Sequence, residues 1–326
     1  MKNESSGKKG LVFGKFLPPH KGHIHLIQEA ASQVEELTVL VCSIKAEPIP
    51  GYLRYGWMKR IFPKLRVLHV TDENPQFPEE HPDFWQIWTH TFEKNMPEGI
   101  DILFTSEHYG DEMARHLNCQ HIMIDQPRET VPISATMIRE NPYEHWEFIP
   151  EVVRPYFIKR VVLTGPESSG KSVLSKKLAA HYQTNYLEEY GRTYVEKFGI
   201  DVDLMDIAHI AGGHIFLEEQ ASLKSNKVLF CDTDLIVTQI WSEIFCGYSP
   251  EWIHLINHTL KYDLFLLLAP DIPWVDDGTR QFSHYSNIHF KRLKDELESR
   301  NLPYVVIEGG YEERFQEAVR AVDKLL

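Results

Sequence analysis

The stretch Gly165–Ser172, Gly-Pro-Glu-Ser-Ser-Gly-Lys-Ser, most strongly constrains what this chain can fold into. The residues just before it are β-branched and apolar, which predicts a buried strand, and apolar residues recur at helical spacing after it. In this setting Gly165 and Gly170 let the loop turn tightly, so that its N–H groups and the helix N-terminus point at phosphate oxygens. Lys171 would reach the β- and γ-phosphates and Ser172 would ligate Mg²⁺. The sequence therefore predicts a nucleoside triphosphate site.

Composition indicates an acidic chain with room for two domains. The 326 residues are enough for two domains of ordinary size. Asp and Glu number 47 against 34 Lys and Arg, which gives a formal net charge of −13. Because neutralising nucleic-acid phosphates requires clustered cations, no general nucleic-acid binding is expected.

Cysteine spacing and apolar runs indicate a cytoplasmic protein. The four cysteines share no Cys-x-x-Cys spacing, so we expect reduced thiols rather than disulfides or a metal site. Residues 1–9 are polar and do not resemble a signal peptide. No apolar run approaches the ~18 residues of a membrane span, so no membrane association is expected.

Short apolar segments alternate with helical patterns along the whole chain. This alternation predicts an α/β fold of two doubly wound domains, each with a mostly parallel sheet. Pro150 and Pro155 bracket the expected boundary between domains of residues 1–155 and 156–326, and residues 142–154 are predicted to form a helix. The predicted strands are 11–16, 37–44, 66–71, 100–106 and 121–125, followed by 160–164, 185–188, 227–232, 264–269 and 304–307.

A second candidate site follows the first predicted strand, at the edge where parallel sheets bind ligands. There His20 and His23 precede an apolar helical stripe at the spacing i, i+3. If the helix begins at these residues, both imidazoles face one spot and form a phosphate site with the helix N-terminus. Histidine suits this task because it can carry charge near neutral pH and still donate directionally. Ordinary surface histidines at a helix start would look similar.

The segment Ile133–Arg139, Ile-Ser-Ala-Thr-Met-Ile-Arg, lies at another predicted helix start. Ser134 is a good N-cap, and Pro142 ends the short helix. Ser134, Thr136 and Arg139 then supply two hydroxyls and a guanidinium. Taken alone, simple capping with a solvated arginine explains the segment equally well.

Together these motifs resemble a known family. Gly14–His23 is similar to the HxGH signature of a nucleotidyltransferase superfamily with a Rossmann-like fold, and Ile133–Arg139 is similar to its ISxTxxR partner. The Gly-Lys-Phe-x-Pro-x-His form resembles nicotinamide-nucleotide adenylyltransferases. Followed by a P-loop kinase, this domain resembles the NadR family of bifunctional nicotinamide-nucleotide adenylyltransferases and ribosylnicotinamide kinases, from about Gly10 to Leu326.

The resemblance implies a role for each motif of the first domain. A mononucleotide phosphate would attack the α-phosphorus of ATP in line, while His20 and His23 stabilise charge on the ATP phosphates as pyrophosphate leaves. Lys15 and Arg139 would hold the phosphate chain. Further ATP contacts are expected from Gly14, Phe16, Glu107, Tyr109, Ser134 and Thr136. Contacts to nicotinamide mononucleotide are expected from Arg54, Trp57, Trp85 and Trp88. Helix packing is at least as good an explanation for one of the last two tryptophans.

In the second domain, a run of apolar residues leads into Asp232, as in the second acidic motif of P-loop enzymes. Asp232 would hold Mg²⁺ together with Ser172. Asp234 is expected to cap the next helix or to contact the sugar. Either Glu188 or Glu189 would take the proton of the attacking hydroxyl, with surface carboxylates as the alternative.

The remaining expectations concern the phosphate loop, a lid and the riboside. Asp276–Arg280 follows the fourth strand, where related kinases have a lid, and Arg280 beside a hinge glycine suits closure over phosphates. The predicted phosphate loop also includes Glu167, Ser168 and Ser169. Riboside contacts are expected from Tyr190, Arg192, Asp234 and Trp274. Trp241 is a further stacking candidate whose default explanation is core packing.

The combined prediction is a bifunctional enzyme of NAD synthesis that uses MgATP in both steps. One domain would phosphorylate nicotinamide riboside, and the other would adenylate the product to NAD. Two alternatives stay open: a regulatory nucleotide sensor in which one half has lost its chemistry, and a fused nucleotidyltransferase–kinase with a different substrate. Some family members begin with a helix-turn-helix repressor domain, for which the residues before Leu11 leave no room, so no DNA-binding role is expected. The number of subunits stays open, a homo-oligomer included.

Overall fold

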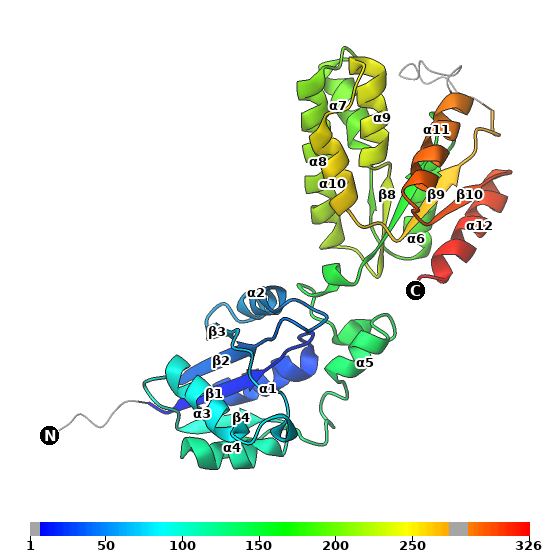
Figure 1. Cartoon of the computed structure of the whole chain (residues 1–326). Coiled ribbons are helices and arrows are strands. Elements are labelled where there is room, and N and C mark those ends of the chain that lie inside the picture. The colour runs from blue at the N-terminus through cyan, green and yellow to red at the C-terminus, as the bar shows by residue number, and fades with distance from the viewer. Residues whose placement is uncertain (1–6, 274–285) are drawn as a thin grey trace. The chain divides into compact units, whose positions relative to one another are not determined.

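The computed structural model describes residues 7–273 and 286–326 (Figure 1). The chain divides into two compact units, Met1–Arg154 and Pro155–Leu326, within one residue of the expected boundary. Each unit contains one five-stranded sheet whose strands are all parallel. The predicted fold class is confirmed, and all ten predicted strands are present.

The sheet of the first unit has the strand order β3-β2-β1-β4-β5. Its strands are β1 (Lys9–Gly14), β2 (Glu36–Cys42), β3 (Arg66–Val70), β4 (Ile102–Thr105) and β5 (Gln120–Met123). Its helices are α1 (Lys21–Ala31), α2 (Gly51–Ile61), α3 (Phe84–Asn95), α4 (Tyr109–Leu117) and α5 (Ala135–Glu140), with short 3₁₀ turns at Pro78–Glu80, Trp146–Phe148 and Arg154–Tyr156. The helix predicted over residues 142–154 is wrong, because only the 3₁₀ turn at Trp146–Phe148 lies within it and that at Arg154–Tyr156 begins at its last residue.

Both faces of this sheet are buried because successive strand residues point to opposite sides. Val12 packs with Ile27 of α1 and Met58 of α2 on one face. Leu11, the residue before it, packs with Phe92 of α3 on the other face, which α4 also covers. The continuous apolar run of β1 therefore fits a central strand with helices on both sides.

The sheet of the second unit has the strand order β10-β9-β6-β8-β7. Its strands are β6 (Lys159–Thr164), β7 (Tyr186–Leu187), β8 (Val228–Asp232), β9 (Leu264–Leu268) and β10 (Tyr304–Ile307). Its helices are α6 (Lys171–His181), α7 (Tyr190–Phe198), α8 (Leu204–Ser222), α9 (Leu235–Cys246), α10 (Glu251–Thr259), α11 (Ser286–Ser299) and α12 (Tyr311–Asp323). Helices α6 and α12 cover one face, whereas α8 and α11 contact strands from the other.

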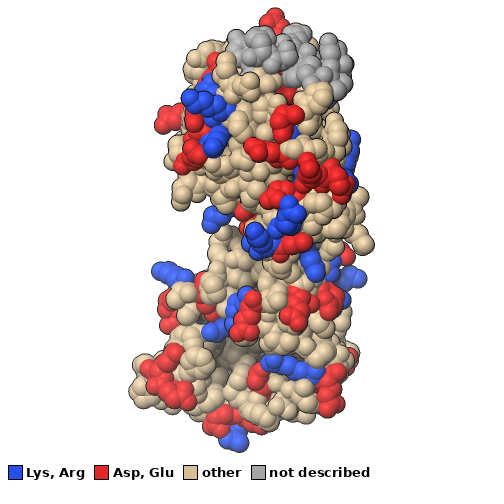
Figure 2. Space-filling view, turned by 90° about the vertical axis from the view of Figure 1, so that its right-hand side faces the viewer, with Lys and Arg blue, Asp and Glu red and all other residues tan. Residues whose placement is uncertain are grey.

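Surface and cysteine features agree with the composition. On the face drawn in Figure 2, Lys and Arg side chains are interspersed with Asp and Glu. All four cysteines are unpaired. None of the helices that the structure describes has the length and apolar character needed to cross a bilayer.

The core of the second unit gives a stability prediction. Leu266, in the middle of β9, is fully buried, so Leu266→Ala should lower the free energy of unfolding by about 3 kcal/mol through lost burial and a residual cavity. Leu255 on α10 is 60% exposed, so Leu255→Ala should change it by less than about 0.5 kcal/mol. Urea unfolding followed by circular dichroism measures both variants. Equal losses would contradict the assignment of β9 to the core.

Candidate active sites

The histidine pair forms a reciprocal cap at the start of α1. His20 is the N-cap residue, and its Nδ1 accepts from the backbone N–H of His23 at 3.3 Å. His23 Nδ1 accepts from the backbone N–H of His20 at 3.3 Å, and the two rings stack with their centroids 3.6 Å apart. A neutral imidazole that accepts at Nδ1 carries its proton on Nε2. The pair therefore presents two N–H donors side by side, and the expectation that both imidazoles share one face is confirmed.

Burial lowers the pKa of both histidines, which favours their uncharged form. Desolvation, followed by the positive charge of Arg128, lowers the pKa of His20 to about 3. Desolvation, His20 and Arg128 hold the pKa of His23 well below its usual value. The lowered pKa values run against the expectation that these histidines carry charge near neutral pH and favour neutral imidazoles with directional N–H groups.

Arg128 is a cation of this site that no sequence pattern indicated. It lies in the connection between β5 and α5, in a turn with φ 56°, and its Nη2 donates to Glu107 Oε1 at 3.0 Å. Its charge reaches both His20 and His23. The sequence offered one weak signal, a basic residue shortly before the Ile-Ser-Ala-Thr segment.

The Ile-Ser-Ala-Thr segment joins the first motif through Arg139. Ser134 caps α5 by accepting from the N–H of Met137 at 3.2 Å, so the predicted cap is confirmed. Arg139 Nη2 donates to Thr136 Oγ1 at 3.0 Å, and its Nη1 donates to the Leu17 carbonyl at 2.5 Å. This bond connects residues 122 positions apart and brings the two motifs to one site. The phosphate contacts of these side chains stay a prediction.

The loop after β1 packs against the histidine pair through Phe16. Phe16 has φ 47° and is 2% exposed, and its ring lies edge-on to His23 with centroids 5.0 Å apart. A Cβ on Gly14 would lie 3.6 Å from the Phe16 ring, an ordinary van der Waals distance. The buried Phe16 ring packs against His23, and the nucleotide contact expected of Phe16 stays a prediction. Lys15 remains half-exposed and pairs with Glu47 at 3.5 Å.

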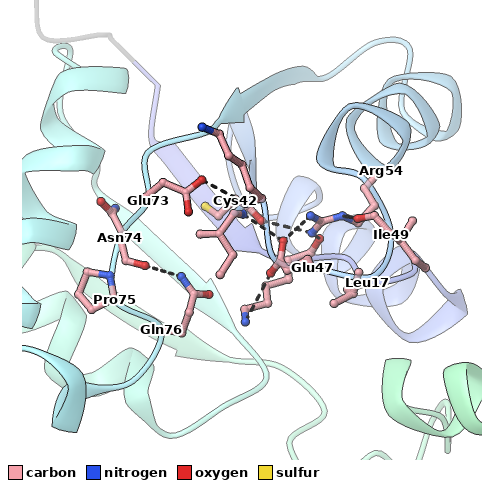
Figure 3. Close-up of polar contacts among 12 residues, drawn as sticks. Leu17, Cys42, Glu47, Ile49, Arg54, Glu73, Asn74, Pro75 and Gln76 are labelled. Carbon is pink, nitrogen blue, oxygen red and sulfur yellow. Dashed lines mark hydrogen bonds and ion pairs between the residues drawn. The ribbon is translucent and has the colours of Figure 1, made fainter.

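Arg54 and two of the predicted tryptophans are structural. The Arg54 side chain is fully buried in α2 and is hydrogen-bonded to backbone carbonyls and to Glu47 (Figure 3). Trp57 is 5% exposed, and Trp88 is buried in the core with its Nε1 donating to the Pro75 carbonyl at 2.9 Å. The predicted substrate contacts of these three residues are therefore wrong.

The other predicted contacts of the first unit are accessible. Trp85 is partly exposed and lies parallel to the His116 ring, with centroids 5.6 Å apart. Tyr109 is 43% exposed at the start of α4, and Glu107 pairs with Arg128. Trp85 lies in the first turn of α3, whereas Glu107 and Tyr109 follow β4, and the ligand contacts of all three stay predictions.

In the second unit, the phosphate loop has the backbone that its glycines predicted. Gly165 has φ 148°, and a Cβ there would lie 2.6 Å from the Leu268 carbonyl oxygen. Gly170 has φ 88°, a left-handed conformation that favours glycine. Lys171 Nζ donates to the carbonyls of Gly165 and Pro166 at 3.0 and 2.9 Å. The ammonium is thus held on its own loop, within reach of the phosphate position.

Oxygen donors for Mg²⁺ lie at the start of α6 and the end of β8. Ser172 Oγ donates to Asp232 Oδ2 at 2.5 Å. Asp232 Oδ1 is buried and makes no hydrogen bond to any described residue. Desolvation raises the pKa of this carboxyl, against the opposing effect of Lys171. An added cation would satisfy the free oxygen, so the donor set fits Mg²⁺, which binds one or two protein oxygens plus substrate phosphates.

The two adjacent glutamates differ in environment. Glu188 is exposed, lies 3.2 Å from Lys176 and accepts from Tyr186, and these contacts lower its pKa. Glu189 lines the cavity beside the phosphate loop. Burial raises the pKa of Glu189 to about 7, with Lys171 opposing the shift. Of the two candidates, Glu189 has the position and the pKa of a general base.

A cavity of about 220 Å³ extends from the phosphate loop toward α9. Lys171, Glu189 and Arg192 line its polar part. Trp241 also lines it and stacks on Phe245, with centroids 5.3 Å apart. Its other lining residues include Ile200, Val202, Ile207, Ile210, His214, Val237, Thr238 and His289. A polar end beside a mostly apolar pocket suits a sugar hydroxyl and a flat ring.

Two predicted riboside contacts have structural roles. Asp234 caps α9 by accepting from the N–H of Val237 at 3.1 Å, so the predicted cap is confirmed. Burial raises the pKa of Asp234 to about 6, and its Oδ2 makes no hydrogen bond to any described residue. The Tyr190 ring packs on Gly213 of α8, where an added Cβ would lie 2.1 Å from it. Trp274 and the lid segment with Arg280 lie outside the described residues.

The comparisons with known proteins cover both units. The Cytidylyltransferase-like family matches residues 11–141, and the AAA domain family matches residues 160–314. The chain is 35% identical over 342 residues to the Trifunctional NAD biosynthesis/regulator protein NadR of Escherichia coli (strain K12), which covers 97% of this chain and 83% of that protein. The chain belongs to the NadR family.

Other relatives agree with this membership. The family member of Salmonella typhimurium is 34% identical over 97% of this chain and 83% of that protein. A Nicotinamide-nucleotide adenylyltransferase of Thermococcus onnurineus (strain NA1) is 28% identical over 47% of this chain and 83% of that protein. Crystal structures of NadR protein, one in complex with NR and one with NAD and AMP-PNP, are 24% identical over 98% of this chain and 96% of theirs, with TM-scores of 0.84 and 0.83. The NadR fold is thus shared.

Sequence reasoning missed several residues of the family's second unit. His214 and Thr238 line the cavity from α8 and α9, and His289 lines it from α11. Trp241 was a stacking candidate with core packing as its default explanation, and the structure places it on the cavity. Its position on an apolar helix, next to Ile240 and two turns from a cap, carried no signal that distinguished it from a core residue.

The contrast between the two glutamates predicts opposite effects on stability. Because the folded-state pKa of Glu189 is raised to about 7 from 4.5, folding favours its protonated form, and its ionised form costs stability as pH rises through this range. Glu189→Gln should therefore unfold at a higher urea concentration than wild type at pH 8, and this difference should shrink toward pH 4.5. Glu188 has a lowered pKa, so Glu188→Gln should give no such gain. Matching profiles for the two variants would contradict the assignment.

Proposed function

We propose that this chain is a bifunctional enzyme of NAD synthesis. The second unit phosphorylates nicotinamide riboside at its 5′-hydroxyl with ATP, and the first unit adenylates nicotinamide mononucleotide with ATP to give NAD and pyrophosphate. One observation carries this proposal: a histidine-based and a lysine-based phosphate site occur together, in the order shared with curated NAD biosynthesis relatives over 97% of the chain.

In the first unit, charge builds on the ATP phosphates as the mononucleotide phosphate attacks the α-phosphorus. The Nε2–H groups of His20 and His23 donate to these oxygens, and neutral donors fixed in advance need no reorganisation. Lys15 and Arg139 hold the phosphate chain, and Arg128 adds positive charge. Catalysis here consists of positioning and electrostatic stabilisation, with no covalent intermediate on the protein.

In the second unit, Glu189 accepts the proton of the 5′-hydroxyl as that oxygen attacks the γ-phosphorus. Its raised pKa suits this task near neutral pH. Lys171 leaves the loop carbonyls to contact the β- and γ-phosphates. Ser172 and Asp232 would hold Mg²⁺, which neutralises phosphate charge when bound. The pocket beside Trp241 takes the nicotinamide ring.

A regulatory sensor is the second candidate, because the relatives from Escherichia coli and Salmonella typhimurium are named as regulators as well as NAD biosynthesis proteins. Incubation with nicotinamide riboside, ATP and Mg²⁺ separates the two functions. NAD formation supports the bifunctional enzyme. If nucleotides bind and no NAD appears, the sensor is supported instead.

Lys171→Ala should abolish phosphorylation of nicotinamide riboside and spare adenylation of added nicotinamide mononucleotide, because the ammonium serves one site. Lys177 lies on the same helix and pairs with Glu312 at the surface, so Lys177→Ala is the matched control and should keep both activities. Product analysis by chromatography measures both steps. Loss of both activities in Lys171→Ala would overturn the division into two sites.

His23→Ala should have the reverse effect, with adenylation reduced about 10²–10³-fold, as for loss of one preorganised donor, and phosphorylation unchanged. His25 lies on the same helix α1 outside the stacked pair, so His25→Ala is the matched control. Rates of NAD formation from nicotinamide mononucleotide and ATP measure the effect. Wild-type rates in His23→Ala would remove this residue from catalysis.

A further inference from the structure

The carboxylate of Glu47 is buried beside the Arg54 guanidinium in the first unit (Figure 3) and forms an ion pair with Lys15. The Glu47 side chain is 6% exposed, and its Oε1 lies 3.5 Å from Lys15 Nζ. Its Oε2 accepts from the backbone N–H of Ile44 at 3.1 Å and from the Arg54 guanidinium. Oε1 makes no hydrogen bond to any described residue. Glu47 Oε1 therefore attracts the Lys15 ammonium by charge without a hydrogen bond. The ammonium can then turn toward another anion without breaking a hydrogen bond to Glu47.

Arg54 fixes the position of this carboxylate. Its Nε donates to the Ile49 carbonyl at 3.0 Å, and its Nη1 donates to the carbonyls of Lys15 at 2.5 Å and Cys42 at 3.4 Å. One guanidinium thereby joins the loop after β1, the end of β2 and the loop that carries Glu47. Because the Arg54 side chain is fully buried, these contacts are shielded from water.

The charges of Lys15, Glu47 and Arg54 would allow the lysine to exchange Glu47 for a phosphate. Two cations, Lys15 and Arg54, share the single carboxylate of Glu47. Lys15 is 44% exposed, so its ammonium can reach a ligand, whereas Glu47 and Arg54 are buried. When Lys15 turns to a phosphate, Glu47 keeps Arg54 as its partner. No buried charge is then left without a partner, so the high cost of an unpaired buried charge is avoided.

We propose that Glu47 is a positioning residue for adenylyl transfer, which holds the Lys15 ammonium ready for the ATP phosphates while Arg54 holds Glu47. This role rests on the proposed adenylation by the first unit. It also explains why a fully buried arginine occurs so close to the predicted phosphate site. Glu47 itself does not touch the reacting atoms.

Glu47→Gln tests the role of the charge. Glutamine has the same size and keeps an acceptor for the Ile44 N–H, but it removes the negative charge that orients Lys15. Lys15 keeps its own charge, so ATP should still bind, with the ammonium poorly placed in the transition state. We expect kcat for adenylation to fall about tenfold, with KM for ATP unchanged or lower.

Glu73→Gln is the matched control. Glu73 Oε1 accepts from the backbone N–H of Lys45 at 3.1 Å, next to the residue that Glu47 contacts, and Glu73 is exposed (Figure 3). The same chemical change thus removes a negative charge beside a similar backbone contact without touching Lys15. This variant should keep wild-type kcat and KM.

A double-mutant cycle with Lys15→Ala separates positioning from support of the fold. If Glu47 acts through Lys15, adding Glu47→Gln to Lys15→Ala should cause no further loss of kcat. Equal losses in both backgrounds, or wild-type kcat in Glu47→Gln, would overturn the positioning role. If Glu47→Gln does not keep the wild-type urea midpoint, Glu47→Asp, which keeps a charge for Arg54, takes its place in the cycle with the same expected coupling.

The wild-type chain separates failure of this role from failure of the proposed function. If the wild type makes no NAD from nicotinamide mononucleotide and ATP, the proposed adenylation is wrong. If it makes NAD and the cycle is additive, adenylation stands and the positioning role of Glu47 is wrong.

Discussion

The parallel register of the central strands is the constraint on which both sites depend. β1 pairs in parallel with β2 and β4, and β6 pairs in parallel with β8 and β9. The carboxyl ends of these strands therefore meet at one edge of each sheet, and the helices that follow begin there. Their N-terminal N–H groups point at that edge, which favours the phosphate sites that we propose there.

The side chains proposed to bind phosphate have different hydrogen-bond and ion-pair partners in the two units. His20 and His23 are neutral because they are desolvated, and each caps the backbone of the other. Lys171 donates hydrogen bonds to carbonyls of its own loop. Lys15 uses a buried carboxylate instead. Each of the two lysines thus has a partner at rest that a phosphate would replace, whereas the imidazoles keep their mutual caps and present their Nε2–H groups.

The features predicted correctly depend on residues that are close in the sequence. The left-handed backbone of Gly170 and the helix caps at Ser134 and Asp234 follow from local geometry. Arg54 was misjudged because its partners include carbonyls 12 and 39 residues away, which no local pattern indicates. Arg128 was missed for a related reason, since its role is to act on histidines more than a hundred residues earlier in the chain.

By itself the sequence determined the α/β class, the two phosphate motifs and their order, because each depends on residue types at short, fixed spacing. Only the tertiary structure decided which of two adjacent carboxylates faces the cavity. Glu188 points to a surface lysine and has a lowered pKa, whereas Glu189 lies beside Lys171 and is desolvated. Neighbouring residues at a strand end point in different directions, and desolvation comes from segments far away in the sequence. For this reason the opposite pKa shifts of Glu188 and Glu189 could be assigned only from the tertiary structure.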